Sequence, residues 1–292
     1  MMAKQFGLIE AGGTKFLLGV ADEDQTIIAT HRIPTTHPDE TIAAALDWFS
    51  AQGKLSAFGI ASFGPLDLDP ASATWGHITQ TTKPGWSHTN LVGPFVARFG
   101  CPVAIDTDVN GAALAESLWG AGAGQRVSLY FTIGTGIGGG AVINGDLLRG
   151  LSHPEMGHIR LPRHPDDLGF AGVCPFHGDC LEGLASGPAI IARWGASLSE
   201  LPSDHPGHAI IAYYLAQLVC TMQAIFQPGR IILGGGVMAT PGLLDRLRDA
   251  AEVQGRGYFV GSAKDVVVAP ALGDQAGLMG ALALAVGAHL KG

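Results

Sequence analysis

The 292-residue sequence has few charged residues and a shortage of positive charge. Charged residues make up 14% of the chain and hydrophobic residues 47%, whereas an average soluble domain is about 25% charged. This composition excludes a mainly disordered chain and predicts one large or two smaller domains with a core that needs no disulfides. Lys and Arg number 17 against 25 Asp and Glu, and no basic cluster could neutralise a row of phosphates, so we expect no nucleic acid partner.

Long hydrophobic runs, a secretory signal and a disulfide framework are also missing. The nearly uncharged apolar stretch at residues 276–290 is shorter than the about 20 residues that span a bilayer, so we expect a buried terminal helix there and no membrane segment. The first ten residues lack the basic start and apolar run of a secretory peptide, which predicts a cytosolic protein. Four cysteines in so long a chain exclude a disulfide scaffold.

Glycine, in contrast, is abundant, with 43 residues and no collagen-like period. Two glycine clusters separate pairs of apolar runs, within residues 6–20 and within residues 128–143. An apolar run, a glycine turn and a second apolar run are typical of a β-hairpin. Because the pattern occurs twice, we expect two related domains. Residues 233–237 form a third glycine turn.

Strands alternate with helices along the chain, which predicts the α/β class. The two glycine-tipped hairpins require antiparallel pairs as well, so we expect mixed sheets. Strands are expected at 57–62, 102–106 and 230–233, and helices at 41–50, 110–118, 188–194 and 208–227.

The second glycine cluster, Gly134 to Gly139, formally fits the dinucleotide motif G-x-G-x-x-G. A strand and an Asn-Gly turn follow it instead of the required helix, which disfavours a nicotinamide enzyme. Each cluster alone fits an ordinary hairpin, but two clusters and a third glycine turn together favour a phosphate site. We expect their backbone N–H groups to face one another across a cleft and to bind a triphosphate. The residues concerned are Gly12, Gly13, Thr14, Gly134, Thr135 and Gly136. The P-loop motif G-x-x-x-x-G-K-[ST] does not occur.

Asp106, Asp108 and Asn110 lie where an expected strand ends and a helix begins. Ligand sites of α/β proteins open at the carboxyl ends of strands, and phosphoryl transfer needs one carboxylate to accept the proton of the attacking hydroxyl. Asp and Asn before a helix are also common turn and cap residues. We favour Asp108 as a catalytic base and keep the capping interpretation open for Asp106 and Asn110.

Cys174, His177 and Cys180 form a C-x2-H-x2-C triplet, a spacing typical of tetrahedral zinc ligands. His158 is the preferred fourth ligand. Four protein ligands close the coordination sphere, so such a zinc ion would be structural and would fix a loop. A reduced cysteine pair beside surface histidines is the other interpretation.

Two further histidines, His153 and His164, are alternatives for the fourth ligand. Glu155 precedes His158 by three residues, and Glu182 follows the last cysteine of the triplet by two. A metal that holds this loop would therefore also orient two carboxylates, which could form hydrogen bonds to sugar hydroxyls.

Several of these motifs resemble, in order and over the whole chain, those of the ROK family of bacterial sugar kinases. The motifs are Glu10–Thr14, Asp106–Asn110, Gly134–Gly138, Glu155–His158 and Leu233–Gly236. Four more resemble the fructokinase branch of that family, at Ser62–Pro65, Thr82–Trp86, His153–His158 and Cys174–Cys180. The resemblance implies an actin/hexokinase-like ATPase fold of two ribonuclease-H-like domains, with mixed sheets and an interdomain cleft.

The resemblance also implies ATP-dependent phosphorylation, with magnesium, of the 6-hydroxyl of a hexose, and of D-fructose in the fructokinase branch. It makes Asp108 the base. It places Gly64, Asp108, Glu155, His158 and Glu182 at the sugar, and Lys15, Pro188, Gly235, Gly236 and Val237 at the nucleotide beside the two glycine loops. The expected domains are residues 1–111 with 275–292, and residues 112–274 with the zinc loop.

Two departures from the family pattern affect these expectations. Family members often carry Asp where this chain has Glu10, which leaves the contact of Glu10 with magnesium open. Many relatives have a three-cysteine zinc cluster, whereas His177 takes one position here, which fits the fructokinase branch and disfavours glucose or N-acetylated sugars. The family's DNA-binding repressors carry an N-terminal helix-turn-helix, and the chain before Phe6 leaves no room for one.

Alternative functions remain within and outside the kinase class. Mannose, glucose or an N-acetylated hexose could be the acceptor. A non-catalytic sugar-binding protein would lack the base, so the presence of Asp108 argues against it. A homodimer is expected from the apolar composition and the resemblance.

Overall fold

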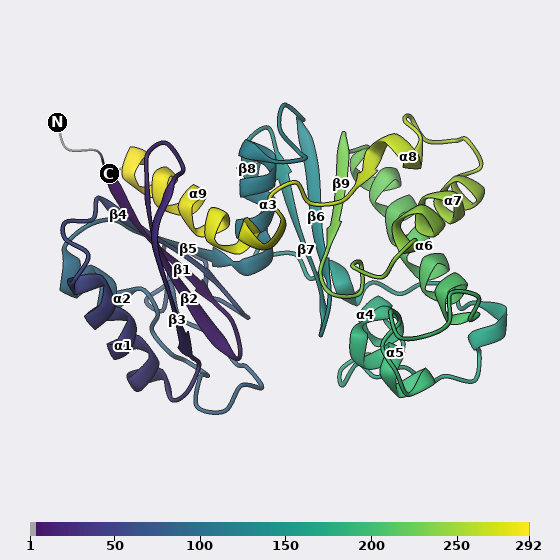
Figure 1. Cartoon of the computed structure of the whole chain (residues 1–292), viewed down its shortest axis with the longest axis horizontal. Helices are drawn as coiled ribbons and strands as arrows, with labels where there is room; N and C mark the ends of the chain where they lie inside the picture. The colour runs from purple at the N-terminus through teal and green to yellow at the C-terminus, as the bar shows by residue number, and fades with distance from the viewer. Residues whose placement is uncertain (1–3, 292) are drawn as a thin grey trace. The chain divides into compact units, whose positions relative to one another are not determined.

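The computed structural model describes residues 4–291 and divides the chain into two compact units, each built around its own sheet (Figure 1). Unit 1 contains the chain up to residue 118, the short segment 149–153 and the chain from residue 272. Unit 2 contains residues 119–148 and 154–271. The chain therefore enters unit 1 three times.

Unit 1 has a five-stranded mixed sheet with the order β3-β2-β1-β4-β5. Three antiparallel strands follow one another, and the last two run parallel to β1. The strands are β1 (Gln5–Ala11), β2 (Lys15–Asp22), β3 (Ile27–Pro34), β4 (Ala57–Ser62) and β5 (Val103–Thr107).

The helices of unit 1 cover both faces of this sheet. On one face, α1 (Pro38–Ser50) and α2 (Gly93–Phe99) share an apolar core with the strands, which includes Ile9, Leu18 and Phe49. On the other face, α9 (Ala276–Lys291) lies along β4 and β1 (Figure 1). Gly59 of β4 permits this approach, because a side chain there would overlap the carbonyl of Ala281. Helix α3 (Asp108–Trp119) follows β5 directly.

Unit 2 repeats the same strand arrangement. Its order, given from the edge that corresponds to β3, is β8-β7-β6-β9-β10. The two antiparallel pairs β6–β7 and β7–β8 and the parallel pairs β6–β9 and β9–β10 correspond, in order, to the pairings of unit 1. The strands are β6 (Val127–Ile133), β7 (Ile137–Ile143), β8 (Asp146–Leu147), β9 (Arg230–Gly234) and β10 (Val267–Val268). The prediction of two related halves is confirmed.

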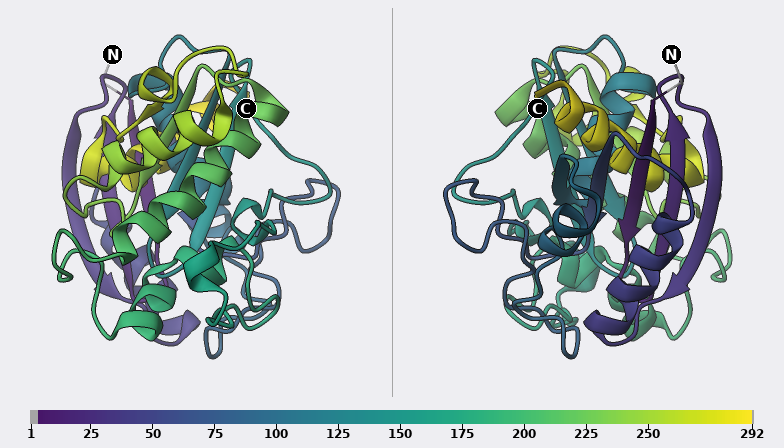
Figure 2. Two further views of the ribbon diagram at one scale, coloured as in Figure 1. Left: turned by 90° about the vertical axis from the view of Figure 1, so that its right-hand side faces the viewer. Right: turned by 90° about the vertical axis from the view of Figure 1, so that its left-hand side faces the viewer.

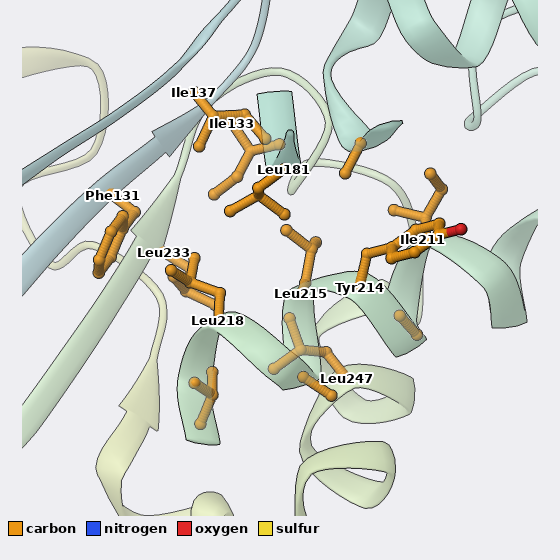
Figure 3. Close-up of a cluster of buried hydrophobic side chains, with 14 of the residues drawn as sticks. Phe131, Ile133, Ile137, Leu181, Ile211, Tyr214, Leu215, Leu218, Leu233 and Leu247 are labelled. Carbon is orange, nitrogen blue, oxygen red and sulfur yellow. The ribbon is translucent and has the colours of Figure 1, made fainter. Parts of the chain in front are cut away.

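The core of unit 2 lies between its sheet and its long helices. Figure 3 shows Phe131 and Leu233 of the sheet packed near Leu215 and Leu218 of α6, with Leu247 of α7 beyond them. The helices are α4 (Leu181–Ala185), α5 (Gly187–Trp194), α6 (Gly207–Phe226), α7 (Leu243–Gly255) and α8 (Ala263–Val266). Three single-turn 3-10 helices occur at Met156–His158, Pro165–Asp167 and Gly273–Gln275.

Helix α6 is, within residues 4–291, the one helix that is long and apolar enough to cross a membrane by length and composition. More than half of its most apolar stretch is buried inside the protein, against the sheet and α7 (Figure 3). A core position therefore accounts for its apolar sequence.

Most elements expected from the sequence are present, with ends that differ by at most three residues. Both glycine-tipped hairpins, the strands near 57–62, 102–106 and 230–233, and the buried terminal helix are confirmed. Strand β3, helix α2 and helix α7 were not predicted. Strand β3 is an edge strand, visible beside β2 in Figure 2, and most of its residues are at least partly exposed, so it lacks a clear apolar pattern.

Candidate functional site

The first glycine loop, at the tip of the β1–β2 hairpin, is held from one side and open on the other. Gly12 N–H donates to the carbonyl of Lys15 at 2.9 Å, which closes the turn. The hydroxyl of Thr35, beyond the end of β3, donates to the Gly12 carbonyl at 2.7 Å. Gly13, Thr14 and Lys15 are exposed. The loop thus presents backbone N–H groups and a lysine to solvent, as an anion-binding turn does.

The second and third glycine loops meet at the end of β6 in unit 2. Gly187 N–H donates to the Gly134 carbonyl at 2.7 Å, which joins the second loop to the start of α5. Val237 N–H donates to the carbonyl of Ile133 at 3.0 Å. Gly235 has a φ of 92°, and a side chain there would overlap the backbone of Ile133, so only glycine fits.

These contacts bring together most residues that the sequence assigned to the nucleotide. Thr135 is exposed at the tip of the second loop, and Pro188 is exposed in the first turn of α5. Gly236 follows in the third loop and is exposed as well. Gly12, Gly13, Thr14 and Lys15 belong to the other unit.

Asp108 begins α3 at the carboxyl end of β5, and its neighbours in unit 1 determine its acidity. It is partly exposed and accepts a hydrogen bond from the N–H of Val109 at 2.9 Å. Burial raises the pKa of Asp108 to about 6; the Val109 bond opposes this rise, the Glu10 carboxylate adds to it, and His153 also opposes it. A carboxylate with this pKa is largely ionised at pH 7 and can still accept a proton.

Asp106 and Asn110, the other polar residues of this turn, have structural roles. Asp106 is fully buried, and its Oδ1 accepts hydrogen bonds from Thr107 N–H at 2.8 Å and Asn110 Nδ2 at 2.7 Å. Its Oδ2 pairs with Arg149. The residue that caps α3 is Thr107, whose hydroxyl accepts from the N–H of Asn110 at 3.1 Å. Among these acids, Asp108 is the one open to a ligand.

Glu10 extends from β1 to the first turn of α9. A side chain at Gly277 would overlap the Glu10 carboxylate, so the absence of a Cβ at this helix position makes room for it. Burial raises the pKa of Glu10, and the nearby Lys15 ammonium opposes that rise. The additional methylene, compared with the aspartate common in the family, is thus accommodated within unit 1.

The four predicted zinc ligands form a compact cluster in unit 2. One ligand atom from each of His158, Cys174, His177 and Cys180 lies within 4.8 Å of the others. His158 Nδ1 is 3.5 Å from Cys180 Sγ and 3.8 Å from Cys174 Sγ, and His177 Nδ1 is 3.6 Å from Cys174 Sγ. Tetrahedral zinc with its usual bond lengths would separate nitrogen and sulfur ligands by about 3.6 Å. The cluster therefore fits a zinc ion.

The two alternative histidines do not join this cluster. His164 Nδ1 accepts a hydrogen bond from Asp166 N–H at 3.1 Å, and its ring packs edge-on against Tyr213. His153 belongs to unit 1. With Nδ1 of His158 directed at the sulfurs, its Nε2 lies 4.0 Å from Glu155 Oε2. A metal bound to Nδ1 would leave Nε2 available to a carboxylate or a ligand.

Glu182 lies between the metal cluster and the second glycine loop. It is in the first turn of α4, two residues after Cys180, and its Oε2 accepts from the N–H of Ile137 at 2.9 Å. A side chain at Gly136 would contact the same oxygen. The sequence suggested a sugar contact for Glu182 but gave no sign of this bond, because the partners are 45 residues apart.

The sequence also gave no sign of a buried ion-pair network that involves the metal loop, residues 152–182. Arg193 Nε lies 2.8 Å from Asp167 Oδ1, and the Tyr214 hydroxyl donates to Asp167 Oδ2 at 2.8 Å. The Arg193 guanidinium also packs over the ring of Phe170. The network connects the loop after His158 to α5 and α6. Its members are far apart in the sequence and form no motif.

The repeated sheet order, the glycine turns and the carboxylate at a strand end define the class of the protein, which has the actin/hexokinase-like fold of ATP-dependent sugar kinases. The chain belongs to the ROK family, whose family model matches residues 6–288.

Relatives of known sequence and structure extend over nearly the whole chain. A fructokinase of Zymomonas mobilis is 51% identical over 99% of this chain and 98% of its own. The crystal structure of a ROK hexokinase from Thermus thermophilus has a TM-score of 0.82 and 27% identity, covering 99% of this chain and 100% of its own. A ROK glucokinase from Streptomyces griseus, in complex with glucose and AMPPNP, has a TM-score of 0.74 and 26% identity, covering 97% and 99%.

Proposed function

We propose that this protein is an ATP-dependent fructokinase that converts D-fructose to fructose 6-phosphate and releases ADP. The observation that carries the proposal is the 51% identity to a fructokinase over 99% of the chain, together with a partly exposed Asp108 at the carboxyl end of β5. The identity to the glucose-bound structure is 26%. Because the chain is more similar to the fructokinase than to this glucokinase, fructose is the first hexose to test as the acceptor.

Asp108 is the catalytic base in this proposal. Its carboxylate accepts the proton of the 6-hydroxyl as that oxygen attacks the γ-phosphorus and the bond to the leaving ADP breaks. The pKa of about 6 leaves Asp108 ionised at neutral pH, and the aspartate is basic enough to accept a proton from an alcohol that is losing it. When bound with ATP, magnesium neutralises phosphate charge.

The glycine loops are the proposed phosphate and nucleotide sites. The N–H groups of Gly12 and Gly134 donate within their own turns, to Lys15 and Gly136, so phosphate oxygens are proposed to bind the other N–H groups of these loops. The Lys15 ammonium adds a positive charge beside the first loop. The proposed nucleotide-binding residues are Gly12, Gly13, Thr14, Lys15, Gly134, Thr135, Gly136, Pro188, Gly235, Gly236 and Val237. The proposed sugar-binding residues are Gly64, Asp108, Glu155, His158 and Glu182.

The His158, Cys174, His177 and Cys180 cluster is the proposed site of a structural zinc ion. The nitrogen and sulfur spacings fit tetrahedral coordination, and four protein ligands leave no position for a reactive water. Zinc bound here would hold Glu155 and Glu182 in place from both ends of the metal loop.

The two compact units are proposed to be the two ribonuclease-H-like domains, with limits near residues 111 and 274. The protein is further proposed to act in the cytosol as a homodimer. Size-exclusion chromatography with light scattering tests the dimer.

A substrate panel tests the proposed function. The purified protein, with ATP and magnesium, is assayed for ADP release with fructose, mannose, glucose and N-acetylglucosamine. We expect the highest kcat/KM with fructose. A higher kcat/KM with another sugar would make that sugar the acceptor in place of fructose. The absence of sugar-dependent ADP release would contradict the proposal that the protein is a sugar kinase.

A further inference from the structure

The segment 149–153 is a short excursion of the chain into unit 1. The residues before it and after it belong to unit 2. Its middle residue, Leu151, is fully exposed, so the segment has no apolar anchor there. At one end of the segment the Arg149 side chain pairs with Asp106, and at the other end Nε2 of His153 lies close to Gly64.

The first end is fixed by an ion pair with a buried acid. Arg149 Nε donates to Asp106 Oδ2 at 3.1 Å, and a guanidinium Nη2 contacts the same oxygen. The Asp106 side chain is 0% exposed, and its other oxygen is already occupied by the bonds from Thr107 and Asn110. A buried carboxylate without a positive partner is costly, so this contact is a firm attachment and not a mobile surface pair.

The second end places an imidazole near the ends of strands β4 and β5. Nε2 of His153 is buried and lies 3.6 Å from the position that a methyl group on Gly64 would occupy. The methyl of Thr107, the residue before Asp108, lies 4.0 Å from the same position. Gly64 lies two residues beyond the end of β4, and Thr107 is the last residue of β5, the parallel neighbour of β4. His153 therefore lies at the strand ends where Asp108 begins its helix.

The charged groups that act on Asp108 come from two elements. Glu10, on β1, disfavours the Asp108 carboxylate, and His153 favours it. Lys15, on β2, acts in turn on Glu10. The electrostatic effect of His153 on Asp108 thus opposes the effect of Glu10.

We propose that the ion pair between Arg149 and Asp106 positions His153 beside Asp108, so that His153 holds the base in its ionised, proton-accepting form. His153 and Arg149 are positioning residues in this inference, which rests on the proposed role of Asp108. The sign of the effect follows from charge: protonated His153 stabilises the carboxylate, and its removal raises the pKa of Asp108.

The test compares pH profiles of kcat/KM for fructose in the unmodified protein, His153→Gln and the control His31→Gln. His31 is an exposed histidine of the same unit that stacks on Trp48. We expect the acid limb of His153→Gln to move to higher pH by roughly half a unit to one unit, with near-normal kcat/KM at the alkaline end. The control should keep the original limb. A purely structural contribution of His153 would lower activity at every pH without moving the limb, and that result would overturn the inference.

Arg149→Lys provides the second variant, because it keeps a positive charge near Asp106 and loses the planar fork of the guanidinium. We expect an acid limb between those of the unmodified protein and His153→Gln, and no further shift when the two substitutions are combined. Independent, additive shifts would contradict positioning of His153 by Arg149.

A carbon-13 NMR titration of the Asp108 carboxyl provides a readout without turnover. If the unmodified protein does not phosphorylate fructose but His153→Gln still raises the Asp108 pKa, the proposed function fails and the electrostatic inference stands. If the unmodified protein is active and neither the limb nor the titration moves in His153→Gln, the inference fails and the proposed function stands.

Discussion

At the scale of single residues, Asp108 is the group on which turnover depends most. Asp108→Asn preserves size and helix position but removes the proton acceptor. We expect kcat to fall by about 10²–10⁴ while fructose binding is largely retained. Steady-state kinetics together with calorimetric titration of fructose checks both parts. Asp39→Asn, at an exposed acid of α1, is the control. Normal turnover in Asp108→Asn would refute its role as base.

The acidity of Asp108 also predicts the pH dependence of the unmodified protein. Because burial raises its pKa to about 6, the base is protonated and inactive below that pH and ionised above it. A plot of log kcat/KM for fructose against pH should therefore rise through an acid limb with a midpoint near 6 and then level off. A limb near the ordinary carboxylate range, about pH 4, would contradict the raised pKa of Asp108.

Glu10 and Gly277 form a second pair whose fit can be measured. Gly277→Ala should lower the free energy of unfolding by about 1–3 kcal/mol, because the new methyl overlaps the Glu10 carboxylate. Adding Glu10→Asp, which shortens the side chain, should restore part of that loss. Gly287→Ala in the same helix meets open space and should not destabilise. Thermal unfolding checks all four proteins, and equal destabilisation by both alanines would contradict the account.

At the scale of elements, the metal loop is the part that depends on an ion. Removing zinc with a chelator at neutral pH should increase hydrogen exchange over residues 152–182 and weaken fructose binding before nucleotide binding. The hydrogen bond from Ile137 to Glu182 keeps the start of α4 attached to β7 when the metal is lost. The second glycine loop, which precedes β7, should therefore change less than the metal loop. Metal analysis and separate titrations of fructose and ATP test this. Equal loss of both affinities would count against it.

The elements that the sequence predicted best are those with a strong local pattern. Glycine tips between apolar runs predicted both hairpins, and the triplet with His158 predicted a metal cluster. The pairing of Arg149 with Asp106 was not predictable, because the residues are 43 positions apart and neither has a motif for the other. The edge strand β3 was missed because its exposed residues carry no apolar alternation.

At the scale of the whole molecule, the division into two related halves was predictable, and the strand order and the path of the chain between the units were not. Two glycine hairpins of one design indicated two related halves, and the order 3-2-1-4-5 recurs in each sheet. The return of α9 to unit 1 was expected from the family resemblance alone. The five-residue excursion at 149–153 has no signature, because the segment is too short for any periodic pattern.

The most direct measurement of the central claim identifies the product. The protein is incubated with ATP, magnesium and fructose, and the sugar phosphate is examined by phosphorus and carbon NMR. We expect fructose 6-phosphate, formed with one ADP per sugar and reduced by about 10²–10⁴ in rate in Asp108→Asn. A phosphate on another hydroxyl, or ADP without any sugar phosphate, would contradict the account.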